Sequence, residues 1–345
     1  MSEATVRDAF IDQAQFCERS GTPVTAAVVR AIGLALDRST ETGRRALDWP
    51  GEPRASADSV PLRLAGGMHA LARRGVDARL SRLYAGDIGG AEYIVAEMLR
   101  RFDAQLIGWL DSPPQTNETG RAAAIMAGLM LLAAEYRLPF ELIELGASAG
   151  LNLNLDRFGY QLGDAKAGDP ESPVLLAPAW EGGLPPSAEV QVIERCGVDQ
   201  NPVRIAELAE RERLIAYCWP DQAGRMARLQ AALALADRHP PPLEQGDAAD
   251  FAERCLGDPQ PEGVTRVIYH TIFWSYLPPD KQARIRAALD AAGAAATLDR
   301  PLAWLRYELE GDSGVAELHV QQWPGGRERH LATGHPHASR IAWHG

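Results

Sequence analysis

The stretch Glu141-Leu-Ile-Glu-Leu-Gly-Ala-Ser-Ala-Gly-Leu, residues 141–151, decides the fold of this chain. A short apolar run from Phe140 to Leu145 leads into this glycine-rich turn, and a run with helical spacing, Leu151 to Phe158, follows it. Glycine is favoured where a chain reverses sharply beside a ligand, because it has no Cβ to block the approach. Backbone N–H groups at the helix start then face the ligand. The stretch therefore predicts a strand, a ligand-binding turn and a helix.

Strand-like and helical stretches alternate through the rest of the chain. The strand candidates are residues 190–193, a short stretch that begins at Leu243, and residues 264–273, 296–298, 304–309 and 315–323, and the helix candidates are residues 202–216, 225–238 and 279–292. This alternation predicts a doubly wound, mostly parallel sheet with helices on both faces. The last two strand candidates have no helix between them, which predicts an antiparallel hairpin at one edge. We therefore expect a Rossmann-like α/β domain over residues 113–345, with a Gly- and Pro-rich insertion at about residues 159–186.

The N-terminal third has a purely helical pattern. Apolar residues recur at helical spacing over residues 6–36 and 62–83, and three prolines break the chain between these runs. A long alanine-rich helix is expected over residues 118–136, where it leads into the first strand. The pattern predicts an all-α domain over residues 1–112.

Composition and charge limit the cellular compartment and the classes of binding partner that we expect for this protein. The formal net charge of -11 disfavours nonspecific binding to nucleic acid. The sequence shows no basic leader followed by an apolar run and no membrane-spanning stretch, so we expect a cytoplasmic protein without a membrane partner. The four cysteines are far apart, and His335-Pro-His337 matches a metal pair in spacing alone, so no metal is expected.

Acidic residues follow the next two strand candidates after the glycine-rich turn. Asp199 and Gln200 come after the second strand, where a carboxylate can accept hydrogen bonds from the two hydroxyls of a ribose. Asp247 and Ala248 come after the third, where a base would lie. Three successive strand ends at the carboxyl edge of a sheet predict a nucleoside pocket.

These residues resemble the motifs of class I S-adenosylmethionine-dependent methyltransferases. Glu144-Leu-Gly-Ala-Ser-Ala-Gly150 resembles the first motif of that family, and residues 267–274 resemble its fourth-strand segment. Two features depart from the family pattern. Ser148 stands where the second glycine is usual, and Asp199 lies 55 residues after Glu144 (199 − 144), where simple dinucleotide folds have about 20. The resemblance implies cofactor-binding roles for Glu144, Gly146, Ala147, Ser148, Gly150, Asp199, Gln200, Asp247 and Ala248.

The whole chain also resembles a bacterial family of unknown function. The resemblance rests on Asn117-Glu-x-x-Arg121, on the Gly-Ala-Ser-Ala-Gly-Leu-Asn turn and on Trp219-Pro-Asp-Gln. Asn117 and Arg121 share one helical face, and we interpret them either as a helix cap with a surface ion pair or as ligands of a cofactor or substrate carboxylate. Trp219 is interpreted first as a packed aromatic residue at a helix junction.

The methyltransferase resemblance implies an enzyme that methylates a small molecule with S-adenosylmethionine as cofactor. Tyr269 and His270 fall at the end of the fourth strand, so His270 is a candidate base, although buried strand residues more often form core. Methyl transfer mainly requires alignment of donor and acceptor, so no dedicated nucleophile is expected.

Three other functions fit parts of the sequence. Gly146-Ala-Ser148-Ala-Gly150 also satisfies the G-x-S-x-G nucleophile elbow of α/β-hydrolases, with Asp299 and either His335 or His337 as further triad members. A nicotinamide-dependent oxidoreductase would share the acid after the second strand, but its G-x-G-x-x-G spacing is missing here. A noncatalytic nucleotide-binding module is the third alternative.

Overall fold

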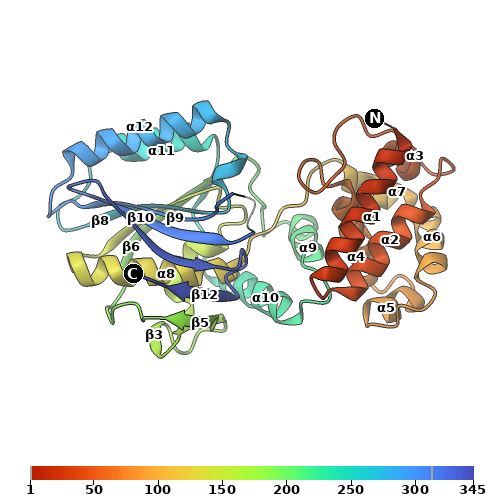
Figure 1. The fold of residues 1–345 in the computed structure, drawn as a ribbon, viewed down its shortest axis with the longest axis horizontal. Coiled ribbons are helices and arrows are strands. Elements are labelled where there is room, and N and C mark those ends of the chain that lie inside the picture. Colours follow the sequence, from red (N-terminus) through yellow and green to blue (C-terminus); the bar gives the residue numbers. More distant parts are fainter. Residues whose placement is uncertain (1, 312–313) are drawn as a thin grey trace. The chain divides into compact units, whose positions relative to one another are not determined.

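The computed structural model describes residues 2–311 and 314–345. It forms two compact units, each shown in Figure 1. Unit 1 contains the described residues up to Thr116 together with Ile205–Ala227, and unit 2 contains Asn117–Arg204 and Arg228–Gly345. The sequence pattern predicted one domain over residues 113–345, whereas residues 205–227 pack with the N-terminal helices in the structure.

Unit 1 is helical. Its helices are α1 (Glu3–Arg19), α2 (Pro23–Ala35), α3 (Glu41–Leu47), α4 (Val60–Arg73), α5 (Ala78–Tyr84), α6 (Ala91–Arg101), α7 (Asp103–Leu106), η1 (Ile107–Leu110) and α9 (Leu208–Ala216). Phe10, Ile32 and Met68 are among the fully buried side chains of its core. A Cβ on Gly33 of α2 would lie 2.5 Å from the Cβ of Phe10 on α1, so this glycine allows the two helices to cross closely.

Asp221 caps helix α2. Its carboxylate accepts hydrogen bonds from the N–H groups of Val24 and Thr25, each at 2.9 Å, and from the Thr25 hydroxyl at 2.7 Å. Because Thr22 at the helix start makes no side-chain cap of its own, Asp221 satisfies the free N–H groups there. The Trp219-Pro-Asp-Gln motif therefore holds unit 1 together from a distant part of the sequence.

Unit 2 is built on a nine-stranded mixed sheet of order β5-β12-β11-β10-β9-β8-β1-β6-β7. Its strands are β1 (Phe140–Leu145), β5 (Ala179–Gly182), β6 (Val192–Asp199), β7 (Leu243–Gln245), β8 (Thr265–Thr271), β9 (Leu302–Leu309), β10 (Ala316–Trp323), β11 (Arg327–Gly334) and β12 (Arg340–Trp343). The strands β7, β6, β1, β8 and β9 run parallel, and in chain order they read 3-2-1-4-5. This is the order of doubly wound nucleotide-binding sheets, whose switch point here lies between β1 and β8.

Helices cover both faces of the parallel strands, as the alternation predicted. Helices α11 (Ala248–Gly257) and α12 (Pro279–Ala295) pack on one face, and α8 (Ala122–Tyr136) packs on the other (Figure 1). Gly128 of α8 allows close packing on β9, because a Cβ there would lie 2.6 Å from Leu305 Cδ2. Helix α10 (Ala223–Arg238) precedes β7. No helix in the described ranges is long and apolar enough to cross a membrane.

The antiparallel part is larger than predicted. Strands β9 and β10 form the expected hairpin, but β11 and β12 extend it, and β5 pairs with β12 at the outer edge. The hairpin therefore lies inside the sheet. Residues 296–298 were predicted to be a strand, yet they contribute only an isolated bridge between Thr297 and Arg300. Within the segment predicted as an insertion, β2 (Gly159–Leu162), β3 (Ala165–Gly168) and β4 (Leu175–Leu176) form a small separate sheet, whereas β5 of the same segment belongs to the main sheet.

Candidate functional site

The turn after β1 has three residues with left-handed backbone. Gly146, Ser148 and Gly150 have φ values of 69°, 56° and 71°. Glycine adopts this conformation freely, whereas Ser148 carries a steric cost. The turn then enters the 3₁₀ segment η3 (Leu151–Arg157), where a helix was predicted.

Protein atoms lie against the two glycines. A Cβ on Gly146 would lie 2.1 Å from the ring of Phe273, and one on Gly150 would lie 2.9 Å from Pro241 Cβ. The predicted need for glycine is therefore explained by φ and by packing within the chain. Ala147, also predicted to bind cofactor, is buried, and its N–H donates to Val198 O at 3.0 Å.

Asp199 ties this turn to the end of β6. Its Oδ2 accepts a hydrogen bond from the Ser148 N–H at 2.8 Å, and its Oδ1 accepts one from the Asn201 N–H at 2.8 Å. Each carboxylate oxygen has a second lone pair, so hydroxyl groups of a ligand can still bind. The neighbouring Gln200 is exposed, and its carbonyl accepts a hydrogen bond from Gln245 Nε2 at 3.2 Å.

Two buried polar atoms in the turn segment lack partners. Ser148 is 6% exposed and Asn152 is 2% exposed, and neither Ser148 Oγ nor Asn152 Oδ1 has a hydrogen-bond partner among the described residues. Buried hydroxyl and amide oxygens are nearly always hydrogen-bonded in folded proteins. The two atoms therefore mark a place where a bound polar group would be stabilised. Asn152 was not predicted, although it belongs to the Gly-Ala-Ser-Ala-Gly-Leu-Asn turn.

Glu144 is a buried acid at the end of β1. The pKa of its carboxyl is raised from 4.5 to about 8, mainly by burial and also by the charge of Asp199, while the hydrogen bond to Tyr269 and the charge of Arg121 oppose the rise. Tyr269 Oη lies 3.1 Å from Glu144 Oε2 and 3.2 Å from the carbonyl oxygen of Asn152. At neutral pH the site therefore contains a protonated carboxylic acid paired with a phenol.

Asp247 begins helix α11 as its N-cap. Its Oδ1 accepts hydrogen bonds from the N–H groups of Ala249 at 2.9 Å and Asp250 at 3.1 Å, and Oδ2 lies 3.4 Å from Lys281 Nζ. Partial burial raises the pKa of Asp247, but the hydrogen bonds from Asp250 and Ala249 and the charge of Lys281 lower it more. The side chain of the neighbouring Ala248 is buried. The predicted adenine position thus coincides with a capped helix start.

His270 is enclosed in a hydrogen-bond network. Its side chain is fully buried, with Nδ1 2.5 Å from Glu308 Oε1 and Nε2 accepting a hydrogen bond from Trp304 Nε1 at 3.1 Å. An indole N–H only donates, so Nδ1 carries the ring proton and donates it to Glu308. Glu308 also accepts hydrogen bonds from the N–H groups of Phe273 and Trp274. His270 therefore positions the loop after β8 and has no free nitrogen with which to act as a base.

The predicted motif at residues 117–121 contacts the turn segment. Asn117 Oδ1 accepts a hydrogen bond from the Leu151 N–H at 2.9 Å, so this residue supports the start of η3. Arg121 lies at the end of the 3₁₀ turn η2 (Thr119–Arg121), and its guanidinium donates to Pro336 O and Thr271 O. Both of these hydrogen bonds go to backbone carbonyls, whereas one interpretation of the sequence paired Arg121 with a carboxylate of the cofactor or substrate.

Glu118 was part of this motif but was not predicted as a site residue. It is 3% exposed, its Oε1 accepts a hydrogen bond from the Gly120 N–H at 3.1 Å, and its Oε2 lies 3.3 Å from His337 Nδ1. Arg228 NH2 lies 3.9 Å from Glu118 Oε1. The Glu118 backbone carbonyl also accepts a hydrogen bond from Asn152 Nδ2 at 3.3 Å, which joins this charged cluster to the turn segment.

Comparison with known proteins assigns the chain to a family. A family model described as "Uncharacterized protein conserved in bacteria (DUF2332)" matches residues 7–343. The chain belongs to the DUF2332 family. No curated protein and no solved structure matches it.

The fold of this DUF2332 chain separates the members of the suggested hydrolase triad. Asp299 precedes β9, and its carbonyl accepts a hydrogen bond from the Gly263 N–H just before β8, so it lies at the amino edge of these parallel strands. Ser148 lies at the carboxyl edge, after β1. A triad of Ser148, Asp299 and a histidine is therefore not assembled.

Proposed function

We propose that this DUF2332 chain binds S-adenosylmethionine at the carboxyl ends of β1, β6 and β7 and transfers its methyl group to a small molecule. The observation that carries the proposal is the 3-2-1-4-5 order of the parallel strands, with a glycine-rich turn at the switch point. In open α/β sheets, ligands bind outside the carboxyl ends of the strands at this point.

The residues at these strand ends have the chemistry that an adenosyl cofactor requires. The carboxylate of Asp199 retains acceptor capacity for ribose hydroxyls beyond its two backbone hydrogen bonds. Ser148 Oγ and Asn152 Oδ1 are buried without a hydrogen-bond partner among the described residues, and they would hold polar groups of the ligand. Both side chains belong to the segment that follows Gly146, so the unpaired atoms and the switch point coincide.

S-adenosylmethionine, when bound, supplies a methyl group on a positively charged sulfur. Transfer would break the carbon–sulfur bond, would form a bond from that carbon to the acceptor atom, and would release a proton from a hydroxyl or amine acceptor. The residues of this chain contribute binding and alignment, which are sufficient for a large rate enhancement. Because both nitrogens of His270 are engaged, His270 would not accept that proton.

Titration calorimetry on the full chain tests this proposal directly. We expect saturable binding of S-adenosylmethionine and S-adenosylhomocysteine and no binding of NADH. Asp199→Asn keeps the shape of the side chain but weakens its acceptor capacity, so it should reduce affinity at least about tenfold, or about 1.4 kcal/mol. Glu194→Gln is the matched control, because Glu194 is an exposed carboxylate on the same strand. The absence of heat with both adenosyl ligands would refute the proposal.

Two observations favour a hydrolase as the second candidate. Ser148 has a left-handed φ on a strand-to-helix type of turn, as a nucleophile elbow requires, and Glu118 lies beside His337 as an acid–histidine pair. However, no base hydrogen-bonds Ser148 Oγ among the described residues. A fluorophosphonate probe distinguishes the two functions, since labelling that is lost in Ser148→Ala would establish a nucleophilic serine.

A further inference from the structure

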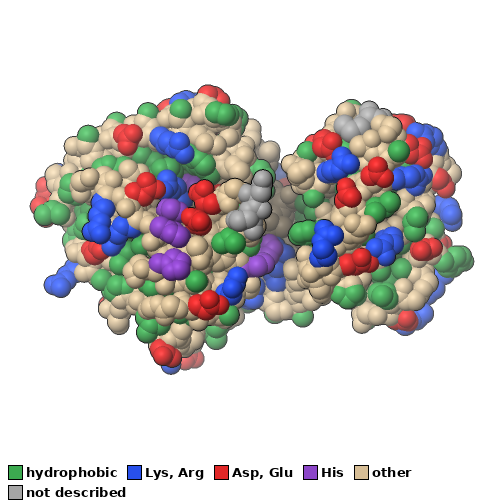
Figure 2. All heavy atoms as spheres, viewed as in Figure 1, with side chains coloured by type: hydrophobic (Ala, Val, Ile, Leu, Met, Phe, Trp, Pro, Cys, Tyr) green, Lys and Arg blue, Asp and Glu red, His purple; other side chains and the backbone are tan. Residues whose placement is uncertain are grey.

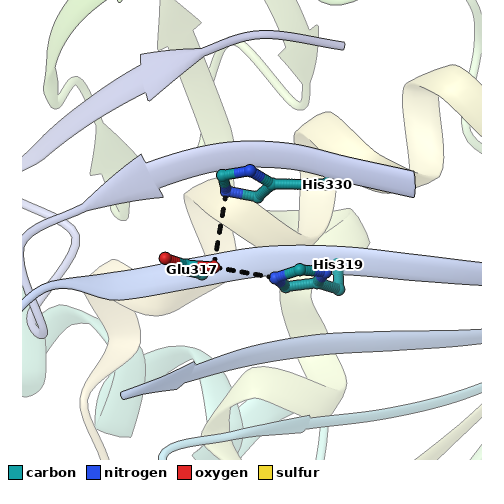
Figure 3. A group of neighbouring side chains, drawn as sticks. All are labelled: Glu317, His319 and His330. Atoms are coloured by element: carbon teal, nitrogen blue, oxygen red, sulfur yellow. Dashed lines mark hydrogen bonds and ion pairs between the residues drawn. The ribbon is translucent and has the colours of Figure 1, made fainter. Parts of the chain in front are cut away.

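Two histidines and a glutamate converge on the antiparallel part of the sheet in unit 2. Glu317 and His319 are two residues apart on β10 and therefore point to the same face, and His319 lies directly opposite His330 on β11. Figure 3 shows the three side chains turned toward one another from the two strands. Histidine side chains also gather on the surface of unit 2 in Figure 2, over the strand that Figure 1 labels β10.

The spacing of the three side chains matches a metal site. His319 Nε2 lies 2.9 Å and His330 Nε2 lies 3.7 Å from the same oxygen, Glu317 Oε2, and one ligand atom from each residue lies within 4.8 Å of the others. Zinc bonds of about 2.0–2.2 Å in a tetrahedral site place neighbouring ligand atoms roughly 3.3 Å apart. The two distances to Glu317 bracket this value, and the ligand atoms of His319 and His330 lie within 4.8 Å of each other, so side-chain rotations would have to bring the two histidines closer around one ion.

The surroundings of His319 support its use as a ligand. A ligating histidine usually has a carboxylate, carbonyl or water at its second ring nitrogen, which fixes the ring orientation. Here His319 Nδ1 lies 3.8 Å from Glu328 Oε1, and Glu328 is itself held by an ion pair with Arg306. The ring of His319 thus presents Nε2 to Glu317 while its other nitrogen faces a carboxylate.

The rings are held on rigid strands and remain accessible. The imidazoles of His319 and His330 stack with centroids 4.8 Å apart and planes inclined by 17°. The side chains of Glu317, His319 and His330 are 30%, 23% and 39% exposed, which gives an ion access from solvent. His330 Nε2 also lies 3.0 Å from Ala332 O, and this contact would be exchanged for the metal bond.

We propose that Glu317, His319 and His330 bind one divalent transition-metal ion, with Zn²⁺ as the best chemical match. Two imidazoles and one carboxylate provide three ligands and leave the fourth tetrahedral position for water or a substrate atom. Mg²⁺ and Ca²⁺ are disfavoured because they prefer all-oxygen sites with six or more ligands. The sequence predicted no metal, because the cysteines are far apart and the pair His335 and His337 matches a metal site in spacing alone, whereas His319 and His330 are eleven residues apart and meet only through the pairing of β10 with β11.

Competition of the untagged, chelator-treated full chain against a chromophoric zinc indicator tests this site. We expect one Zn²⁺ per chain and a Co²⁺ form with the intense visible absorption of a tetrahedral site. His319→Ala and His330→Ala should each weaken binding at least as much as loss of an outer-shell partner does, about 10–100-fold. Glu328→Gln should have a smaller effect, and His239→Ala, a histidine elsewhere in unit 2, should match the wild type.

The outcomes separate a metal site from a simple ion pair. If Glu317 and His319 form only an ion pair, the wild type will not compete with the indicator, and the proposal fails. It also fails if the His319→Ala/His330→Ala double variant binds zinc as well as the wild type does, because the ion would then be held elsewhere. Melting curves of the variants exclude unfolding as the cause of lost binding, since the three side chains are partly exposed.

Discussion

Replacement of Glu144 by glutamine should change the pH dependence of stability. Glu144 is a buried acid whose pKa is raised from 4.5 to about 8, mainly by burial. The folded chain therefore binds a proton at Glu144 that the unfolded chain releases above its ordinary pKa. Glu144→Gln keeps the size of the side chain and an acceptor for Tyr269 Oη, which lies 3.1 Å from Glu144 Oε2, but it cannot ionise.

The sign and size follow from proton linkage. The free energy of unfolding changes with pH in proportion to the protons bound by the unfolded state minus those bound by the folded state. Between pH 4.5 and about 8 this difference is negative for Glu144, so the free energy of unfolding falls as the pH rises. The stability that the protonated Glu144 contributes is therefore fully present below pH 4.5 and is lost as the pH rises through 8. The free energy of unfolding changes by about 1.4 kcal/mol per pH unit in this range, so the total change between pH 4.5 and 8 is about 5 kcal/mol.

Urea unfolding of the wild type and Glu144→Gln from pH 5 to pH 8.5 measures this difference. The two units make a two-step transition possible, so near-ultraviolet circular dichroism and tryptophan fluorescence should be followed together. The stability of the variant relative to the wild type should increase with pH across this range. Glu194→Gln, at an exposed position of β6, serves as the control. Parallel curves for wild type and Glu144→Gln would show that Glu144 does not titrate in this interval and would refute the reasoning.

Three further substitutions test the turn and the helix cap. Ser148→Ala removes a buried hydroxyl that has no partner among the described residues. Thermal unfolding should therefore show that the free energy of unfolding of the ligand-free chain rises by about 1 kcal/mol, while affinity for the adenosyl ligands falls. A loss of stability would contradict this expectation. Gly146→Ala should lower the free energy of unfolding by at least about 2 kcal/mol, because φ is 69° and the new Cβ would lie 2.1 Å from the Phe273 ring. In a double-mutant cycle, Phe273→Ala should recover part of this loss. If the effects of the two substitutions were strictly additive, the contact would be excluded. Asp221→Ala should lower the free energy of unfolding by about 1–2 kcal/mol, because it removes the cap of α2, and Asp221→Asn should lower it less. Equal melting temperatures for the wild type and Asp221→Ala would exclude the cap.

The parallel core of unit 2 was predictable because its signals are local. Buried parallel strands are rich in apolar residues, and β1 and β8 are recognisable in the sequence by their apolar centres, Leu142-Ile143 and Val267-Ile268-Tyr269. The strand-turn-helix order at residues 141–151 then fixes where the carboxyl edge lies. Strand β11 was missed because its sequence, Arg-Glu-Arg-His-Leu-Ala-Thr-Gly, begins with four polar residues on a partly exposed surface. Its pairing with β10 depends on the whole sheet, and the periodicity of residues within the segment does not indicate it.

Residues 205–227 show a different limit of sequence analysis. Helix α9 and Asp221 follow β6 in the chain, so alternation alone assigns them to the α/β domain. Their partners are in unit 1, where Asp221 caps α2 and His69 Nδ1 lies 2.9 Å from Ala216 O. Such contacts join residues almost 150 or 200 positions apart, and a single sequence contains no signal for them.

Several site residues have contacts that a motif could not foresee. The glycines at 146 and 150 were expected to make room for a ligand, yet Phe273 and Pro241 lie closest to them. His270 was a candidate base from its position at a strand end, but Glu308 and Trp304 engage both ring nitrogens. The residue types at strand ends were therefore informative about location, whereas their hydrogen-bond partners depended on strands β8 and β9 lying side by side.

The two acids nearest the turn differ in burial and in their hydrogen-bond partners, and this difference bears on the proposed cofactor. Asp199 is half-buried and accepts hydrogen bonds from two backbone N–H groups, and its oxygens keep lone pairs for hydroxyl donors. Glu144 is buried beside a phenol, and with a pKa of about 8 it is mostly neutral at physiological pH and can donate a hydrogen bond. A ligand that places hydroxyl donors at Asp199 and its positive charge nearer Glu144 would lower the pKa of Glu144 and release a proton on binding. Calorimetry in buffers of different ionisation enthalpy would detect that proton, and its absence at pH 7 would place the positive charge of the ligand away from β1.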